Sequence, residues 1–343
     1  MSEIFLKTKL YPPIPSRGVV SRPRLLEKLG SGIGGGVTLI SAPAGFGKTT
    51  LLASWVATVT DPVAWLSLDA GDDDLASFLI GLVAALRTVE AGLGEGVLSL
   101  MRSPQLQEME ALLTPLINEM AGLPERSILV LDDYHLLEDP LLGKALAFLV
   151  EHLPASLHLV IASREDPPLP LPRIRARGKL NELRVRDLRF SRAEAREFFE
   201  TLGVELKEEE IDALEGRTEG WAAGLQLAAI SLEGENDRAA FIRSFTGSHR
   251  FVLDYLLEEV LEKQSAEVQR FLLSTSILRR LSGPLCDALL EEPEGSGQAT
   301  LERLERSNLF LLPLDNERRW YRYHHLFGDL LRQRLGQAGS EGL

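Results

Sequence analysis

The stretch from Ala42 to Thr50, APAGFGKTT, has the residue types of a phosphate-binding loop. Gly45 and Gly47 have no Cβ, so the backbone can adopt left-handed angles and turn successive N–H groups toward phosphate oxygens. Lys48 would reach the β- and γ-phosphates of a nucleotide, and the Thr49 hydroxyl would hold Mg²⁺. The residues expected to bind the nucleotide are Ala44, Gly45, Phe46, Gly47, Lys48, Thr49 and Thr50.

The segments around this loop favour phosphate binding over the alternative, a glycine-rich turn followed by an ordinary surface lysine. An apolar run at 37–40 precedes the loop and a segment rich in leucine and alanine follows it, which is typical of a strand-to-helix turn. The amino end of that helix would add its positive dipole end. Ala42 stands where the usual motif has its first glycine, so the loop fits a relaxed form of the pattern.

Two acids end a second apolar run, and they are the expected partners of the loop. Residues 127–131 are typical of a strand buried on both faces, and Asp132 and Asp133 follow directly. On a parallel strand neighbouring the loop, Asp132 would hold Mg²⁺ and Asp133 would orient or deprotonate the attacking water. The alternative is a strand followed by a helix cap, and the phosphate loop favours the catalytic interpretation.

Further apolar runs, separated by helical patterns, predict a parallel α/β sheet over the first half of the chain. Strands are expected at 37–40, 63–68, 127–132 and 157–161, with a last one at 183–185. Arg164 follows the strand at 157–161 and would face the ligand crevice at the carboxyl ends of the strands, where it could sense the γ-phosphate. A solvated loop arginine is the alternative.

From Ser191 the pattern becomes helical, with Ser191 and Glu194 spaced as a capping box. Helices near 250–263 and 265–275, the start of a short helix at 282–285 and a helix at 298–307 precede two short extended runs at 309–314 and 320–323. Helices followed by such a hairpin predict a winged helix. The expected domains are a P-loop nucleotide-binding domain at 1–188, a helical domain at 189–246 and a winged-helix domain at 247–343.

Composition excludes several classes of protein. Of 343 residues, 45% are hydrophobic and 25% charged, which is typical of a soluble globular protein. No apolar run is long enough to span a membrane and the start has no signal-peptide core, so we expect a cytoplasmic protein without membrane contact. A net charge of −13 counts against a main role in nucleic-acid binding.

These motifs together resemble those of the signal-transduction ATPases with numerous domains (STAND). Within that class they are similar to the MalT-like, LuxR-type large ATP-binding transcriptional regulators. The resemblance covers nearly the whole chain. It depends on Lys9–Leu10 with Pro12–Pro13, Val20–Pro23, Ala42–Thr50, Trp65–Asp69, Leu131–His135, Ser163–Arg164, Glu219–Leu227 and Tyr321–Phe327.

The resemblance implies a switch that uses ATP, ADP and Mg²⁺. In such proteins ADP holds a closed state, and exchange for ATP with an inducer opens the module for self-association, with slow hydrolysis. Val20 and Arg22 would then lie beside the adenine and ribose, and His324 would reach the β-phosphate of ADP from the winged helix. The turn at 220–225 would approach the nucleotide, although it lacks the proline found in relatives. The alternative is that His324 and His325 only cap the last helix.

Two other functions stay open: a continuously cycling AAA+-like ATPase motor, and a DNA-binding protein acting through its winged helix. A motor would need a second arginine finger, for which Arg173, Arg175 and Arg177 are the only candidates. Inducer-binding repeats and a DNA-binding helix-turn-helix, usual in the family, are not visible before Leu343. We therefore expect a fragment of a longer regulator, whose inducer and DNA are bound by C-terminal domains absent from this chain.

Overall fold

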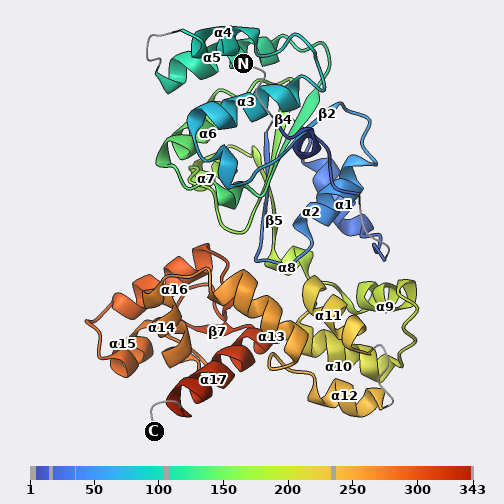
Figure 1. Ribbon diagram of the computed structural model, residues 1–343, viewed down its shortest axis with the longest axis vertical. Coiled ribbons are helices and arrows are strands. Elements are labelled where there is room, and N and C mark those ends of the chain that lie inside the picture. Colours follow the sequence, from blue (N-terminus) through green and yellow to red (C-terminus); the bar gives the residue numbers. More distant parts are fainter. Residues whose placement is uncertain (1–4, 15–17, 35, 104–107, 233–236, 341–343) are drawn as a thin grey trace. The chain divides into compact units, whose positions relative to one another are not determined.

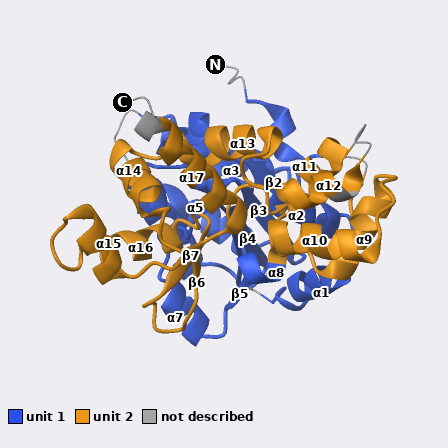
Figure 2. Cartoon of the chain, turned by 90° about the horizontal axis from the view of Figure 1, so that it is seen from below, with its two compact units in different colours: residues 1–16, 22–42, 48–187 blue, residues 17–21, 43–47, 188–343 orange. Residues whose placement is uncertain are grey.

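The computed structural model describes residues 5–14, 18–34, 36–103, 108–232 and 237–340. The chain forms two compact units (Figure 2). Unit 1 comprises residues 1–16, 22–42 and 48–187, and unit 2 comprises 17–21, 43–47 and 188–343. The five residues 43–47 thus belong with the second half of the chain. Among the described residues, no helix combines the length and apolar character needed to cross a bilayer.

Unit 1 is built on a five-stranded parallel sheet (Figure 1). Its strands lie in the order β2-β3-β4-β1-β5. Every residue of β1, β3 and β4 is buried, as expected for apolar runs covered on both faces. The strands are β1 (Val37–Ser41), β2 (Val63–Ser67), β3 (Ser127–Asp132), β4 (Leu157–Ser163) and β5 (Leu180–Arg184).

The fifth strand begins earlier than the sequence pattern predicts. We expected it at 183–185, whereas β5 spans Leu180–Arg184 and pairs only with β1. It is an edge strand with one fully buried residue, Leu183, so the apolar signal that marks a central strand is missing from Leu180–Glu182.

Helices and short helical turns connect and cover the strands of unit 1. The buried side chains of β1–β4 pack with those of α3, α5 and α6 in one apolar core. The elements are η1 (Lys7–Leu10), α1 (Pro23–Ser31), α2 (Lys48–Val56), η2 (Ala70–Asp72), α3 (Leu75–Leu86), α4 (Glu95–Met101), α5 (Met109–Ala121), η3 (Tyr134–Leu136), α6 (Pro140–Glu151), α7 (Leu171–Ala176) and α8 (Val185–Leu188).

Unit 2 is largely helical. The predicted capping box at its first full helix is confirmed: Glu194 N–H donates to Ser191 Oγ, and Ser191 N–H donates to Glu194 Oε2. Its helices are α9 (Arg192–Thr201), α10 (Glu208–Thr218), α11 (Ala222–Leu232), α12 (Arg238–Ser244), α13 (Arg250–Leu256) with the π-helical turn η4 (Leu257–Leu261), α14 (Ala266–Thr275), α15 (Gly283–Leu290), α16 (Ser296–Arg306) and α17 (His325–Ser340).

The winged-helix pattern near the carboxyl end is confirmed. Helices α14, α15 and α16 are followed by an antiparallel hairpin of β6 (Leu311–Pro313) and β7 (Tyr321–Tyr323), with Leu311 opposite Tyr323. A further bridge joins Leu281 to Tyr321. Helix α17 begins two residues after β7, so His324 occupies the corner between strand and helix.

Candidate functional site

Lys48 is a buried cation at the first residue of α2. Only 7% of Lys48 is exposed, and its Nζ donates a hydrogen bond to Ala42 O over 2.8 Å. Burial lowers the pKa of the Lys48 ammonium to about 8; Arg164 adds to this lowering, while Asp133 and Asp132 oppose it. The side chain therefore stays largely protonated at neutral pH, and an anion beside it would recover part of its desolvation cost.

Asp132 and Thr49 form a hydroxyl–carboxylate pair near Lys48. Thr49 Oγ1 donates to Asp132 Oδ1 over 3.1 Å. Burial raises the pKa of Asp132 to about 6, and the charge of Asp133 adds to the shift. Asp133 adopts left-handed angles at φ 58°, and its side chain is 42% exposed. One acid is therefore buried against the hydroxyl, and the next is open to water.

Thr49 and Asp132 are the candidate oxygen ligands for a magnesium ion in unit 1. No group of three or more His, Cys, Asp or Glu side chains in the described residues is arranged to hold a metal. Thr49 and Asp132 supply one hydroxyl and one carboxylate, whereas Mg²⁺ is usually six-coordinate and often keeps water and substrate phosphates. The pair fits an ion that arrives with a nucleotide.

The strand order corrects one expectation about Asp132. We expected its strand to be a neighbour of the strand before the loop, but β4 lies between β1 and β3. Thr49 reaches Asp132 because it projects from α2. The strands that pair with β1 are β4 and β5, and Arg164 follows the last residue of β4, Ser163. Arg164 is only partly exposed, and its charge acts on Lys48.

The middle of the loop, residues 43–47, packs within unit 2 against the turn that begins α11. Trp221 Nε1 donates to Ala44 O over 3.0 Å, and Ala223 N–H donates to Gly45 O over 2.9 Å. Two loop carbonyls are thereby held by one turn. Gly45 and Gly47 have φ of 75° and 74°, the left-handed angles expected from their sequence positions.

We predict that Gly45→Ala destabilises the nucleotide-free chain more than Gly47→Ala. A Cβ at Gly45 would lie 2.6 Å from Ala223 Cβ and 2.7 Å from Trp221 Nε1, whereas one at Gly47 meets nothing within 4 Å. Both changes strain a left-handed backbone, and only Gly45→Ala adds a clash of about 1–3 kcal/mol. Thermal unfolding of the two variants side by side measures the difference. Equal midpoints would contradict the packing against Trp221.

His324 is buried in unit 2, with 1% of its residue exposed. Its Nε2 lies 2.9 Å from Thr218 O, and its backbone N–H donates to Phe310 O over 2.8 Å. Because a carbonyl only accepts, Nε2 carries a hydrogen, and in a neutral ring Nδ1 is then an acceptor. That Nδ1 is buried without a hydrogen-bond partner among the described residues. Burial lowers the pKa of His324 to about 4.

Aromatic rings connect His324 to the loop within unit 2. The ring of Phe310 lies 6.2 Å from Phe46 and 5.6 Å from His324, and Trp221 lies 5.3 Å from Phe310 and 6.0 Å from His324, between centroids. Phe46 is therefore two ring contacts from His324, although 278 positions separate them in the chain (324 − 46). Sequence reasoning singled out Phe46 and His324 but missed Phe310.

The two residues expected beside adenine and ribose are both buried. Val20 is 6% exposed, and Arg22 is 7% exposed at the position before α1. They fall in different units, Val20 in unit 2 and Arg22 in unit 1. Their role stays a prediction.

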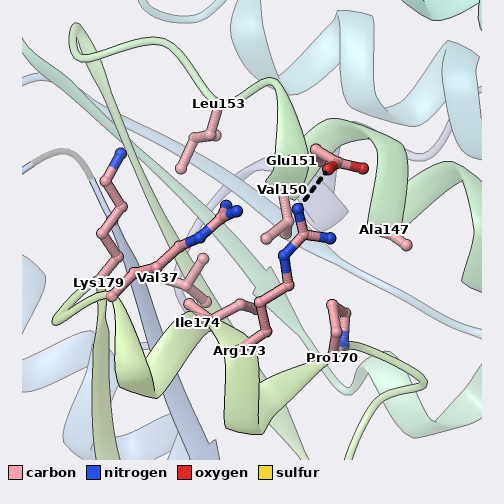
Figure 3. Close-up of a pocket in the computed structure, with 11 residues that line it drawn as sticks. Val37, Ala147, Val150, Glu151, Leu153, Pro170, Arg173, Ile174 and Lys179 are labelled. Atoms are coloured by element: carbon pink, nitrogen blue, oxygen red, sulfur yellow. Dashed lines mark hydrogen bonds and ion pairs between the residues drawn. The ribbon is translucent and has the colours of Figure 1, made fainter.

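A cavity of about 110 Å³ lies at the other end of β1 from Lys48 (Figure 3). It is lined by Val37, the first residue of β1, together with Ile174, Arg173 and Arg177. The guanidinium of Arg173 pairs with Glu151 at 3.2 Å, as the dashed line in Figure 3 marks. Two of the suggested arginine fingers, Arg173 and Arg177, thus stand at the amino end of β1. They do not face Lys48 of their own chain, because Lys48 follows the carboxyl end.

Sheet and loop together define a class. Five parallel strands in the order β2-β3-β4-β1-β5, with a glycine-rich loop and lysine between β1 and α2, make a P-loop ATPase fold. A Walker-type ATPase of Pyrococcus abyssi superposes with a TM-score of 0.63 at 15% identity, covering 95% of this chain and 100% of that one. A STAND protein with a tetratricopeptide repeat sensor from Pyrococcus horikoshii has a TM-score of 0.50 at 18% identity, covering 97% of this chain and 44% of that one. The expected fold class is confirmed.

Sequence comparison is more specific. Residues 257–343 match the MalT winged helix domain. The HTH-type transcriptional regulator MalT of Klebsiella pneumoniae is 36% identical over 336 residues, which cover 96% of this chain and 37% of that protein. The chain is thus similar in sequence to MalT over nearly all of its own length, and it spans 37% of the length of this relative. The resemblance seen in the motifs is confirmed.

Proposed function

We propose that this chain is the nucleotide-controlled switch of a MalT-like transcriptional regulator. Bound ADP maintains a closed resting state, and ATP with an inducer produces an open state that self-associates. Hydrolysis of ATP is slow and resets the switch. Inducer and DNA are bound by other parts of the regulator, in keeping with the net charge of −13 of this chain. The proposed domains are 1–188 for nucleotide binding, 189–246 for the helical domain and 247–343 for the winged helix.

The contacts of His324 carry the proposal. A residue of the winged helix lies in the same aromatic cluster as Phe46 of the phosphate loop, and its buried Nδ1 lacks a hydrogen-bond partner among the described residues. Such an atom is costly unless something pairs with it, and a phosphate oxygen of ADP would do so by accepting a hydrogen bond from Nδ1–H of the protonated ring. A nucleotide that contacts the histidine favours one arrangement of the winged helix over others, which a switch requires and a motor does not.

The chain's own residues suit this nucleotide. The loop amides from Gly45 to Thr49 and the Lys48 ammonium would hold the phosphates, while Thr49 and Asp132 would hold Mg²⁺. Bound Mg–ATP supplies the γ-phosphoryl group that passes to water. Asp133, open to solvent, orients that water and accepts its proton, and Arg164 acts on the γ-phosphate.

The nucleotide present in purified protein tests this function. Protein purified without added nucleotide is denatured, and the released compound is identified by chromatography; we expect close to one ADP per chain and turnover far slower than that of motor ATPases. Rapid steady-state turnover of ATP would contradict the switch and favour the motor ATPase. Salt-dependent DNA retention by this chain would favour the DNA-binding alternative.

We predict that Asp133→Asn slows ATP hydrolysis by roughly 10²–10⁴-fold, because the amide cannot accept a proton. Asparagine tolerates the left-handed angles of this position, so folding should persist. Single-turnover assays of hydrolysis, with ADP affinity measured in parallel, test the prediction. Glu138→Gln, at an exposed site five residues on, serves as control. Unchanged hydrolysis in Asp133→Asn would remove this carboxylate from the reaction.

A further inference from the structure

Glu219 is a buried carboxylate that joins the helical region to the winged helix inside unit 2. It follows the last residue of α10 and adopts left-handed angles, φ 50° and ψ 35°, with 6% of its side chain exposed. A non-glycine residue in this conformation carries a backbone cost of about 1–2 kcal/mol. Burial of a charge adds a second cost, so its surroundings must offset both.

Both carboxylate oxygens of Glu219 accept two hydrogen bonds each. Oε1 accepts from Arg322 Nη1 at 2.7 Å and from the backbone N–H of His325 at 3.0 Å. Oε2 accepts from Arg322 Nη2 at 2.7 Å and from Arg189 Nη2 at 3.1 Å. The bond to Arg322 is thus bidentate, the strongest geometry available to such a pair. Burial opposes ionisation of Glu219, but the hydrogen bonds and charge of Arg322 and the hydrogen bond from the His325 backbone outweigh it and lower the pKa of Glu219 to about 2.

The residues that Glu219 holds flank His324 in the chain. Arg322 lies two positions before the histidine, and His325 directly follows it. The residue before Glu219, Thr218, accepts the Nε2–H of His324. Two consecutive residues of the α10 end therefore hold the segment 322–325 at three points. One contact holds the ring of His324, a second holds the backbone N–H of His325, and the third holds the guanidinium of Arg322.

The same turn continues into the contacts with the phosphate loop. Trp221, two residues after Glu219, donates to Ala44 O, and Ala223 N–H donates to Gly45 O. Residues 218–223 are thus a single connector, with His324 held at one end and loop carbonyls at the other. A shift of segment 322–325 relative to this connector would move Nδ1 of His324 away from the loop.

We propose that Glu219 is a positioning residue for His324, and that its ion pair with Arg322 holds the histidine in register with the phosphate loop and so retains ADP. This inference rests on the proposed function. Loss of the Glu219 charge releases segment 322–325 and lets ADP escape faster. The carboxylate itself touches no nucleotide.

Release of a fluorescent ADP analogue, measured by stopped-flow chase in the full chain, tests the proposal. Glu219→Gln keeps the shape and removes the charge, and we expect release to accelerate roughly 10- to 100-fold. Arg322→Gln should match it, and the double variant should be no faster than either single one. Glu209→Gln, at an exposed position of the same helix, is the control and should release ADP at the wild-type rate.

A cycle with His324 separates positioning from general structural support. In a His324→Ala background, Glu219→Gln should change ADP release by less than about twofold, since nothing remains to position. An equal acceleration in both backgrounds would overturn the proposal, and so would wild-type release by Glu219→Gln alone. A wild-type chain that binds no ADP would instead refute the proposed function. Unfolding of each variant by circular dichroism identifies any change that acts by loss of fold.

Discussion

Replacing Lys48 with alanine is expected to yield purified protein without bound nucleotide. The ammonium is buried beside the loop, and burial holds its pKa near 8, so most molecules carry the charge at neutral pH. A charge-assisted bond to phosphate in such a setting contributes about 1.5–3 kcal/mol, and Lys48 can donate more than one. We expect ADP affinity to fall by roughly 100-fold or more, on the same arithmetic.

The stability of the empty protein distinguishes this effect from misfolding. Lys48 pays a desolvation cost without nucleotide, so Lys48→Ala should leave the nucleotide-free chain as stable as wild type or more so. Thermal unfolding with and without ADP measures both quantities, and only the shift caused by ADP should disappear. Lys144→Ala on the exposed side of α6 is the matched control. Retention of ADP by Lys48→Ala would refute the assignment of the loop.

Replacing His324 should have the second largest effect, because its Nδ1 is the buried atom for which ADP would supply a partner. We expect His324→Ala to release ADP roughly 10- to 100-fold faster while folding normally. Stopped-flow release of a fluorescent ADP analogue measures the change. Glu209→Gln, at an exposed position of α10, is the control. If His324→Ala released ADP at the wild-type rate, the histidine would lie outside the site.

The state of the ring makes this contact depend on pH. Nε2–H is committed to Thr218 O, so Nδ1 can donate to a phosphate only when the ring is protonated. In the nucleotide-free chain burial lowers the pKa of His324 to about 4, opposed by the nearby charge of Glu219 and reinforced by Arg189 and His325. A phosphate at Nδ1 would raise that pKa, so the bound state holds the extra proton. Affinity for ADP therefore falls as pH rises, by at most about tenfold per unit, until pH exceeds the pKa of the bound state.

The pH dependence of ADP affinity also contains contributions from Lys48 and from the phosphates of ADP. Comparing wild type with His324→Asn therefore identifies the contribution of the His324 proton. ADP affinity measured by calorimetry between about pH 6 and 8 should fall more steeply with pH in wild type than in the variant. Calorimetry in buffers of different ionisation enthalpy should show proton uptake that the variant lacks. Parallel pH profiles would mean that a neutral His324 makes the contact, or that it makes none. The variant His325→Gln shows whether the neighbouring imidazole contributes to the pH dependence of ADP affinity.

Local spacing predicted much of the fold. The apolar run before the glycine loop and the one that ends at Asp132–Asp133 were correctly predicted as central strands. A strand buried on both faces has apolar residues at successive positions, so its sequence is recognisable. The hairpin after three helices was equally clear. The edge strand β5 was placed wrongly for the same reason, since its polar residues carry no such signal.

Some residues of the candidate site could be predicted from the sequence, and others could not. Gly45, Gly47, Lys48 and Thr49 could be chosen from residue type, because a phosphate loop needs those properties within one turn. Glu219 could not, although it stands in a recognisable Glu-Gly-Trp turn. Its partner Arg322 is 103 positions away, and nothing in one sequence pairs the two.

The amino-acid sequence by itself determined the chemistry of the loop, the class of the sheet and the winged-helix pattern, because each depends on neighbours within a few residues. Only the tertiary structure decided that β4 separates β1 from β3, and that one turn holds His324, Arg322 and two loop carbonyls. Those arrangements depend on how distant elements pack and on which buried charges find partners. Such choices follow from the energy of the whole folded unit, and no short stretch of residues specifies them.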